Sequence, residues 1–295
     1  MYESFAGYKH DTMPPAFFFL ISAVFHYLGP SLAVLLFAHV GVLGVAWLRI
    51  ATAAVVFAVW RRPWRNVTDA RVLALGVVLA AMNSLFYLAV ARLPLATVGA
   101  IEFLGTVVLA AAGARTRRNL IALVLAVGGV AALTEVRLAG QPLGFLLAFG
   151  NCAGFMVYVV LGHRVANNGP SGIDQLGAAM LVAAIVATPV GIGGAAPAIR
   201  HPVWLLWGAG VGVCSSVIPY VSDQLAMARL SRATFALMLA LLPATATVIG
   251  LVVLGQVPTP LDLLGIGLVV AGVALHKDAQ HKDAQHKSEI AQADQ

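Results

Sequence analysis

Residues Ala89–Thr97 read AVARLPLAT, and 137 positions later residues Ala226–Thr234 read AMARLSRAT, so both copies share the pattern A-x-A-R-L-x-x-A-T. Each copy lies between two long apolar stretches, and the repeated unit is therefore a helix-loop-helix. A repeat at a fixed spacing decides the architecture of a chain before any local motif does. In an apolar chain it predicts two related helical bundles, the construction of many transporters.

The composition places these helices in a lipid bilayer. Apolar residues make up 60% of the 295 residues and charged residues only 10%, whereas about a quarter of an ordinary soluble domain is charged. The apolar runs recur near the ~20-residue length that crosses a bilayer. We predict ten spans, which leave no room for a soluble catalytic domain: 15–38, 41–60, 71–91, 94–113, 119–134, 142–162, 174–195, 202–226, 232–253 and 260–276.

The basic residues between the spans predict the orientation of the chain. With both termini in the cytoplasm, the inner side carries Lys9, Arg61, Arg62, Arg65, Arg71, Arg115, Arg117, Arg118, Arg164, Arg229, Arg232, Lys277, Lys282 and Lys287. The outer side carries only Arg92, Arg137 and Arg200. This asymmetry follows the positive-inside rule. The net charge of +6 therefore reflects topology, and we expect no nucleic-acid partner.

The repeat and the charges together predict two halves of opposite orientation. A shift of 137 residues carries the third span onto the eighth, and five spans is an odd number, so the copies enter the membrane from opposite sides. We predict an all-α membrane protein of ten transmembrane helices in two inverted five-helix repeats, residues 14–138 and 139–276. We expect residues 1–13 to form an N-terminal cytoplasmic segment and the polar residues 277–295 to form a disordered cytoplasmic tail.

Two charged residues of opposite sign lie inside the predicted spans. A charge in hydrocarbon costs about 2.5–3.5 kcal/mol even on lenient insertion scales, so each requires a reason. Arg49 and Glu102 both lie eight residues into helices that run inward, which places them at a common depth of about 12 Å. They could form a static ion pair between two helices. They could also line a polar cavity in which Glu102 meets an amine or a proton and Arg49 meets a carboxylate.

A polar stripe accompanies this pair in both halves. Tyr220, Asp223 and Gln224 share one face of the eighth span, and the repeat shift maps Asn83 and Tyr87 of the third span onto Tyr220 and Gln224. Both repeats therefore present polar side chains at the same place. Asp223 could instead lie close enough to the cytoplasmic surface to be hydrated.

The sixth and first spans offer further polar side chains. Tyr158 and Asn151 of the sixth span could face the same space, although a membrane tyrosine is often an interface anchor. His26 precedes Gly29-Pro30 and could simply neighbour a helix kink. Cys152 and Cys214 have no metal-ligand spacing, and we expect no cofactor and no metal.

Particular motifs connect this chain to a known group of proteins. They are Ala46-Trp47-Leu48-Arg49, Met82-Asn83-Ser84-Leu85-Phe86-Tyr87-Leu88, Ala100-Ile101-Glu102-Phe103-Leu104-Gly105, Tyr158 with Gly162-His163-Arg164, Ile218-Pro219-Tyr220, and Thr234-Phe235. With these motifs the chain resembles the drug/metabolite transporter superfamily, EamA type, and looks most like its inner-membrane threonine/homoserine exporters. The likeness covers about residues 14 to 276.

The resemblance implies a central basket of helices from both halves, and efflux of a small metabolite driven by the proton gradient. The chain departs from the exporter pattern at two acidic positions. Leu242 precedes Pro243 where the pattern has Glu-Pro, and Gln256 follows Gly255 where it has Gly-Glu. Glu102 and Asp223 are then the main buried carboxylates.

These observations predict a secondary transporter, not an enzyme, in the cell inner membrane. It would export small amino acids such as threonine or homoserine; the alternatives are an exporter of aromatic amino acids or drug-like solutes and, remotely, an intramembrane enzyme. Its partners would be a small-molecule substrate and the lipid bilayer, and it could work as a homodimer. Asp223 or Glu102 would couple protons, and the predicted substrate-binding residues are Arg49, Asn83, Tyr87, Glu102, Tyr158, Tyr220 and Gln224.

Overall fold

The computed structural model describes residues 15–113, 117–135, 141–167, 172–228 and 241–275. Within these ranges every regular element is helical. The elements are α1 (Pro15–Leu36), α2 (Val42–Arg61), η1 (Trp64–Asn66), α3 (Ala70–Val90), α4 (Leu95–Gly113), α5 (Arg117–Glu135), α6 (Pro142–Asn167), α7 (Gly172–Arg200), α8 (Pro202–Gly212), η2 (Val213–Val217), α9 (Ile218–Met227), α11 (Leu241–Leu254) and α12 (Pro260–Leu275).

These helices match the predicted spans closely. The segments Val42–Arg61, Ala70–Val90, Pro142–Ala166, Gly172–Arg200 and Pro202–Met227 are long and apolar enough to cross a membrane, and the last of them joins α8, η2 and α9. Five shorter apolar helices occupy the remaining predicted spans. Residues 232–240 of the ninth span, the second copy of the repeat from Arg229 onward, the joint 136–140 and the segments 1–13 and 277–295 lie outside the described residues.

Local sequence sets several of the helix starts. Pro15, Pro142, Pro202 and Pro260 each stand first in their helix, where a missing N–H costs nothing and the fixed φ suits the helical turn. Asp69 begins α3 as an N-cap, because its carboxylate accepts a hydrogen bond from the Arg71 backbone N–H at 2.7 Å.

The surface and the interior of the bundle have the polarity expected of a membrane protein. Val59, Leu206 and Val252 are more than 70% exposed. Ionisable Arg49 and Glu102, by contrast, are 3% and 2% exposed. A soluble domain almost never fully buries charged residues without pairing them. An apolar exterior around a polar centre is the arrangement that a bilayer demands, because charges in membrane helices face the bundle interior.

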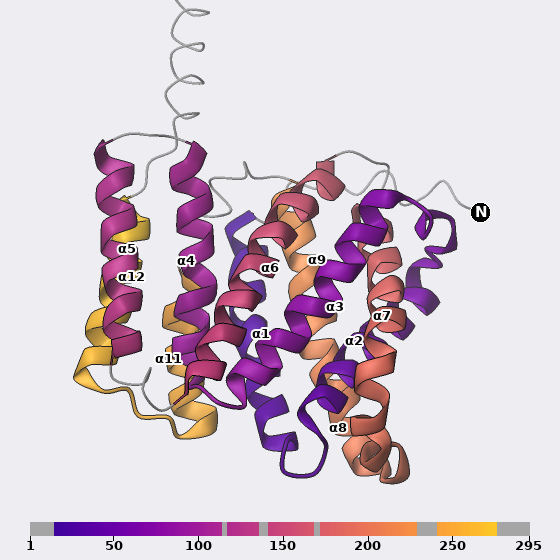
Figure 1. Cartoon of the computed structure of the whole chain (residues 1–295). Helices are drawn as coiled ribbons and strands as arrows, with labels where there is room; N and C mark the ends of the chain where they lie inside the picture. Colours follow the sequence, from indigo (N-terminus) through magenta and orange to yellow (C-terminus); the bar gives the residue numbers. More distant parts are fainter. Residues whose placement is uncertain (1–14, 114–116, 136–140, 168–171, 229–240, 276–295) are drawn as a thin grey trace, which may run out of the picture.

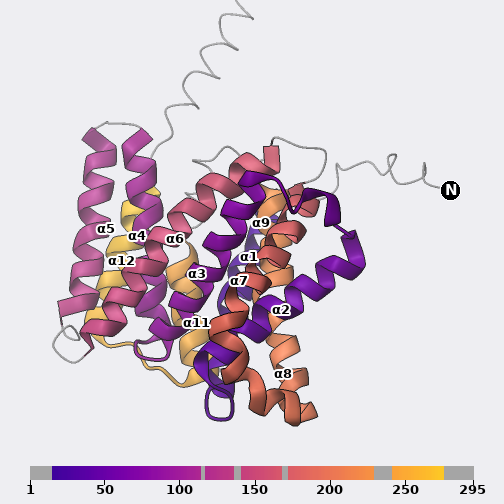
Figure 2. The same cartoon turned by 45° about the vertical axis from the view of Figure 1, so that its right-hand side comes forward.

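The helices form two groups, shown in Figures 1 and 2. One group contains α4, α5, α11 and α12, and the other contains α2, α3, α7, α8 and α9. α1 and α6 connect the groups: α6 packs against both α3 and α4, and α1 packs against both α9 and α11. These two helices therefore supply side chains to any site at the centre of the bundle.

Backbone contact joins α2 and α7. Gly44 lies directly against Gly194, with no room for a Cβ atom, and the Gly41 N–H donates to the Gly194 carbonyl at 3.2 Å. The Trp47 indole N–H donates to Thr188 Oγ1 at 2.9 Å next to this contact. Small residues permit such close approach in lipid, where hydrophobic attraction between helices is weak.

The eighth predicted span is continuous but contains a π-helical turn, η2. Pro219 has no N–H, so the carbonyl of Ser215, four residues earlier, cannot make its α-helical hydrogen bond. The helix widens here, and the Ile218 N–H donates to the Val213 carbonyl five residues back. Gly29 of α1 packs so tightly against Ser215 that a side chain could not be accommodated. Such single-turn π segments occur frequently at functional sites.

Candidate functional site

Arg49 projects from α2 to the widened turn of the eighth span. Its Nε donates to Ser216 Oγ at 2.8 Å, and its Nη2 donates to the freed Ser215 carbonyl at 2.7 Å. The Tyr220 hydroxyl lies 3.4 Å from Nη2, and the guanidinium lies 5.3 Å from the centre of the Tyr87 ring. All of these groups are neutral. They hold the guanidinium in place, and none of these hydrogen bonds pairs its positive charge with a carboxylate.

Asn83 and Tyr220 extend this cluster from α3 to α9. The Tyr220 hydroxyl donates to Asn83 Oδ1 at 3.1 Å, and Asn83 Nδ2 donates to the Leu79 carbonyl at 2.7 Å. The hydroxyl of Tyr220 can therefore accept from Arg49 while it donates to Asn83. Asn83 and Tyr220 are separated by 137 positions, the spacing of the sequence repeat.

Glu102 of α4 stands in a second cluster. Its Oε1 accepts from Asn151 Nδ2 of α6 at 3.1 Å, and its Oε2 accepts from the Tyr27 hydroxyl of α1 at 3.3 Å. His26 Nε2 lies 3.9 Å from Oε2. Glu102 thus has polar neighbours from both helices that connect the two groups of the bundle.

A small cavity lies between the Arg49 and Glu102 clusters. Its walls consist of His26, Arg49, Met82, Asn83, Phe86, Glu102, Asn151 and Tyr220. Its volume is about 10 Å³, roughly the room for one water molecule. Among the described residues, Arg49 Nη1 has no hydrogen-bond partner, and Arg49 and Glu102 form no direct ion pair. The static pair considered from sequence is therefore absent, and both charges line one cavity.

Asp223 of α9 is buried outside this cavity. Its Oδ1 accepts from Ser22 Oγ of α1 at 2.5 Å, and its Oδ2 accepts from the Tyr158 hydroxyl of α6 at 3.1 Å. Asp223 is 1% exposed, so the alternative of a hydrated surface carboxylate is wrong. The Tyr158 ring lies 5.5 Å from the Tyr220 ring, which connects this site to the cavity wall.

Gln224, the next residue, faces elsewhere. Its side chain is 2% exposed, and neither amide atom has a hydrogen-bond partner among the residues that the structure describes. The amide lies beside Gly162 of α6 and Gly172 at the start of α7: Cβ atoms there would stand 3.5 Å from Nε2 and 3.2 Å from Oε1.

The predicted site residues therefore separate into three places. Arg49, Asn83, Glu102 and Tyr220 line the cavity, with the Tyr87 ring beside Arg49. Tyr158 and Asp223 are hydrogen-bonded to each other outside the cavity, and the Gln224 amide lies beside α6 and α7.

Of the hydroxyl groups that contact these charges, sequence reasoning named only those of Tyr158 and Tyr220. Ser22 and Tyr27 of α1 and Ser215 and Ser216 of η2 were missed, because single hydroxyl side chains are ordinary in apolar helices. Pro219 was the available signal for Ser215, since a proline inside a span exposes the carbonyl four residues before it.

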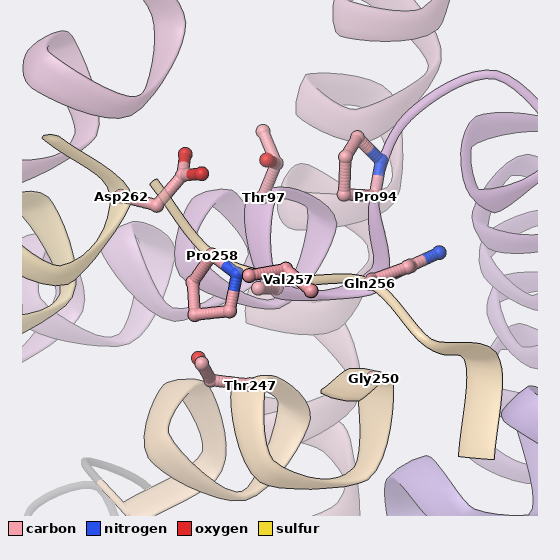
Figure 3. Close-up of a pocket in the computed structure, with 9 residues that line it drawn as sticks. Pro94, Thr97, Thr247, Gly250, Gln256, Val257, Pro258 and Asp262 are labelled. Carbon is pink, nitrogen blue, oxygen red and sulfur yellow. The ribbon is translucent and has the colours of Figure 1, made fainter. Parts of the chain in front are cut away.

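A second pocket, of about 40 Å³, lies near the ends of α4, α11 and α12 that are predicted to face outward. Figure 3 shows Val257 and Pro258 between Thr97 and Thr247, with Asp262 to one side. Gln256 Oε1 accepts a hydrogen bond from the Leu95 N–H at 3.1 Å and so caps α4. The amide that replaces the expected acid therefore satisfies a helix N-terminus.

The fold and the buried charges define a polytopic helical membrane protein with a small polar site at its centre. Comparison with known proteins specifies the class. The EamA-like transporter family matches residues 142–276. The threonine/homoserine exporter RhtA of Escherichia coli K12 is 34% identical over 254 residues, which cover 82% of this chain and 84% of that protein. RhtA of Salmonella typhimurium LT2 matches with the same identity and coverage. The chain therefore belongs to the EamA-like transporter family.

One solved crystal structure is similar in fold. It superposes with a TM-score of 0.56 and covers 88% of this chain and 95% of its own. The two sequences are 20% identical, so this likeness concerns the fold alone.

Proposed function

We propose that this chain is a secondary exporter of small zwitterionic amino acids, with threonine and homoserine as the first candidates. The observation that carries the proposal is the pair of opposite charges, Arg49 and Glu102, on the walls of one buried cavity. The guanidinium suits the substrate carboxylate, and the Glu102 carboxylate suits the ammonium group. The names of the RhtA relatives support the same substrate class.

The small size of the cavity supports transport by alternating access. Room for about one water is far too small for an amino acid, so the helices around the cavity part before substrate binds. Asn83, Tyr220 and the Tyr87 ring then become the remaining walls of the site. We infer that the described conformation is the occluded one, and that each side opens in turn.

Helix packing supports inverted repeats with halves at 14–138 and 139–276. Exchange of the two halves carries α1 onto α6, α2 onto α7, α3 onto the α8–α9 segment, α4 onto α11 and α5 onto α12. Under this exchange the contact of α1 with α9 becomes that of α6 with α3, and the contact of α1 with α11 becomes that of α6 with α4. The pairs α2–α7, α4–α11 and α5–α12 are each exchanged into themselves, and each is in contact.

The hydrogen bond between Asn83 and Tyr220 gives the same support at the level of side chains. Two residues separated by the repeat spacing occupy equivalent positions in the two halves. Equivalent residues touch each other only where they lie next to the pseudo-two-fold axis. The bond of 3.1 Å therefore supports a pseudo-two-fold axis beside the cavity. A substrate at that point can be reached from either side in turn.

The proposal also includes coupling of export to the proton gradient through a buried carboxylate. Among the described residues the hydrogen-bond partners of Asp223, Ser22 and Tyr158, are both neutral. The Tyr158 and Tyr220 rings separate Asp223 from the proposed substrate charges. It could therefore change protonation without direct competition from the substrate. We assign proton coupling to Asp223, and Glu102 is the alternative.

Location and assembly complete the proposal. We place the chain in the inner membrane with both termini in the cytoplasm, on the strength of its loop charges. A homodimer stays a prediction.

The test is uptake into inside-out vesicles that carry only this protein, with labelled amino acids and with or without an acid-inside proton gradient. We expect uptake of threonine or homoserine that the gradient increases, and loss of this uptake in Arg49→Gln. Uptake of aromatic or drug-like solutes alone would favour the second candidate class. No uptake of any solute would contradict the proposal.

A further inference from the structure

Gln224 of α9 carries a buried amide. It is 2% exposed, and both Nε2 and Oε1 lack a partner among the described residues. Most buried side-chain polar atoms in native proteins have at least one hydrogen-bond partner. An amide left unsatisfied in the interior loses its hydration without compensation, so the closed structure carries a penalty at this position. An unsatisfied buried group in a native protein calls for an explanation, and a functional role in another state of the protein is one.

The Gln224 amide lies where α9 meets α6 and α7. Gly162 of α6 and Gly172 of α7 flank it, and a Cβ atom at Gly172 would stand 3.2 Å from Oε1. Both of these neighbours lack a side chain, so none from Gly162 or Gly172 would block the amide when the helices part. Gln224 lies one turn beyond Tyr220 toward the predicted cytoplasmic end of the eighth span, about 6 Å along the helix axis.

The repeat indicates which state would use it. Gln224 and Tyr87 are separated by 137 positions, and the Tyr87 ring lies 5.3 Å from the Arg49 guanidinium beside the cavity. In alternating access by inverted repeats, equivalent residues of the two halves exchange surroundings between the two states. Gln224 would then face the substrate path when the bundle opens on the predicted cytoplasmic side.

We propose that Gln224 is the first substrate contact on the predicted cytoplasmic side, in a subsite that forms when α6, α7 and α9 part. Its amide both donates and accepts, so it fits the carboxylate and the ammonium of an amino acid alike. The subsite passes the substrate to Arg49 and Glu102. This inference rests on the proposed function.

The first test is the stability of Gln224→Met, a substitution of similar size that removes the unpaired amide. The melting temperature Tm of the purified protein in detergent should rise by about 2–4 °C, because the penalty of the closed state disappears. Gln256→Met is the matched control: it removes an amide that caps Leu95, and it should lower Tm. A Gln224→Met variant that melts earlier than the wild type, or fails to fold, would overturn the inference.

The second test separates the two faces of the membrane. In inside-out vesicles, the KM for uptake should rise about ten-fold in Gln224→Met, while the KM measured from the opposite face in right-side-out vesicles stays unchanged. An equal change at both faces, or no change at either, would overturn the role of Gln224. If the wild type transports no amino acid, the proposed function fails and this inference fails with it. Normal wild-type transport with an unaffected variant removes this inference alone.

Discussion

Glu102 and Asp223 have nearly identical local chemistry and different surroundings. They are 2% and 1% exposed, and each accepts hydrogen bonds from two neutral side chains. In both cases one donor comes from α1 and the other from α6. Glu102, however, lines the cavity opposite Arg49, whereas Asp223 does not touch the cavity.

The two carboxylates occupy two layers of the bundle. On α1 the donors are Ser22 for Asp223 and Tyr27 for Glu102, five residues apart, and on α6 they are Tyr158 and Asn151, seven residues apart. At 1.5 Å per residue the layers are separated by roughly 8–10 Å along the helices. A sliding movement of α1 or α6 therefore changes the hydrogen bonds of both acids together. This gives a physical route by which a proton on one acid can influence substrate at the other.

Replacement of the cavity acid should have the largest effect. Glu102→Gln keeps the size of the side chain and removes the charge that we assign to the substrate ammonium. Loss of one member of a buried charge pair costs about 2–5 kcal/mol, so gradient-driven uptake and exchange should both fall at least about 30-fold. Counterflow exchange in preloaded vesicles measures the second quantity. Exchange at the wild-type rate would show that Glu102 does not contact substrate.

Asp223→Asn should separate driven transport from exchange. We expect gradient-driven efflux to fall more than ten-fold, because the proton carrier is lost, while exchange stays within about three-fold of the wild type. Asp69→Asn is the control, since an asparagine caps α3 as well as aspartate does. Driven export at the wild-type rate in Asp223→Asn would move the coupling role to Glu102.

The smallest expected effects come from a matched pair of tyrosines. Tyr27→Phe removes one donor from Glu102, and Tyr158→Phe removes one from Asp223. Each leaves its carboxylate a second donor, so the loss of stability should be near 1 kcal/mol. Tyr27→Phe should raise the KM several-fold, whereas Tyr158→Phe should change only the response of uptake to the proton gradient. The reverse pattern would exchange the roles of the two acids.

Much of this architecture is predictable from sequence. The spans follow from runs of apolar residues, and the common depth of Arg49 and Glu102 follows from counting residues along two helices. Both side chains line the cavity, as one of the alternatives drawn from sequence required. Depth is a local property of each helix, which is why it can be counted.

Direction around a helix is harder to predict. A helical wheel places Tyr220, Asp223 and Gln224 on one face of the helix. In the structure, however, Tyr220 lines the cavity, Asp223 contacts α1 and α6, and Gln224 lies beside α6 and α7. α9 is a short helix crowded by several neighbours, so adjacent residues meet different helices. The partners of Glu102 and Asp223 on α1 also escaped prediction, because they lie 75 and 201 positions away in the sequence.

The distance in sequence between Arg49 and its partners has a consequence for how the protein is made. Ser215, Ser216 and Tyr220 follow it by 166 to 171 residues. At about 5–20 residues per second, a ribosome needs on the order of 10–30 s to reach them. During that time the nascent α2 carries a charge that the bilayer penalises by about 2.5–3.5 kcal/mol. We therefore expect α2 to reach its full stability only after the eighth span is inserted and its π-helical turn accepts hydrogen bonds from the guanidinium.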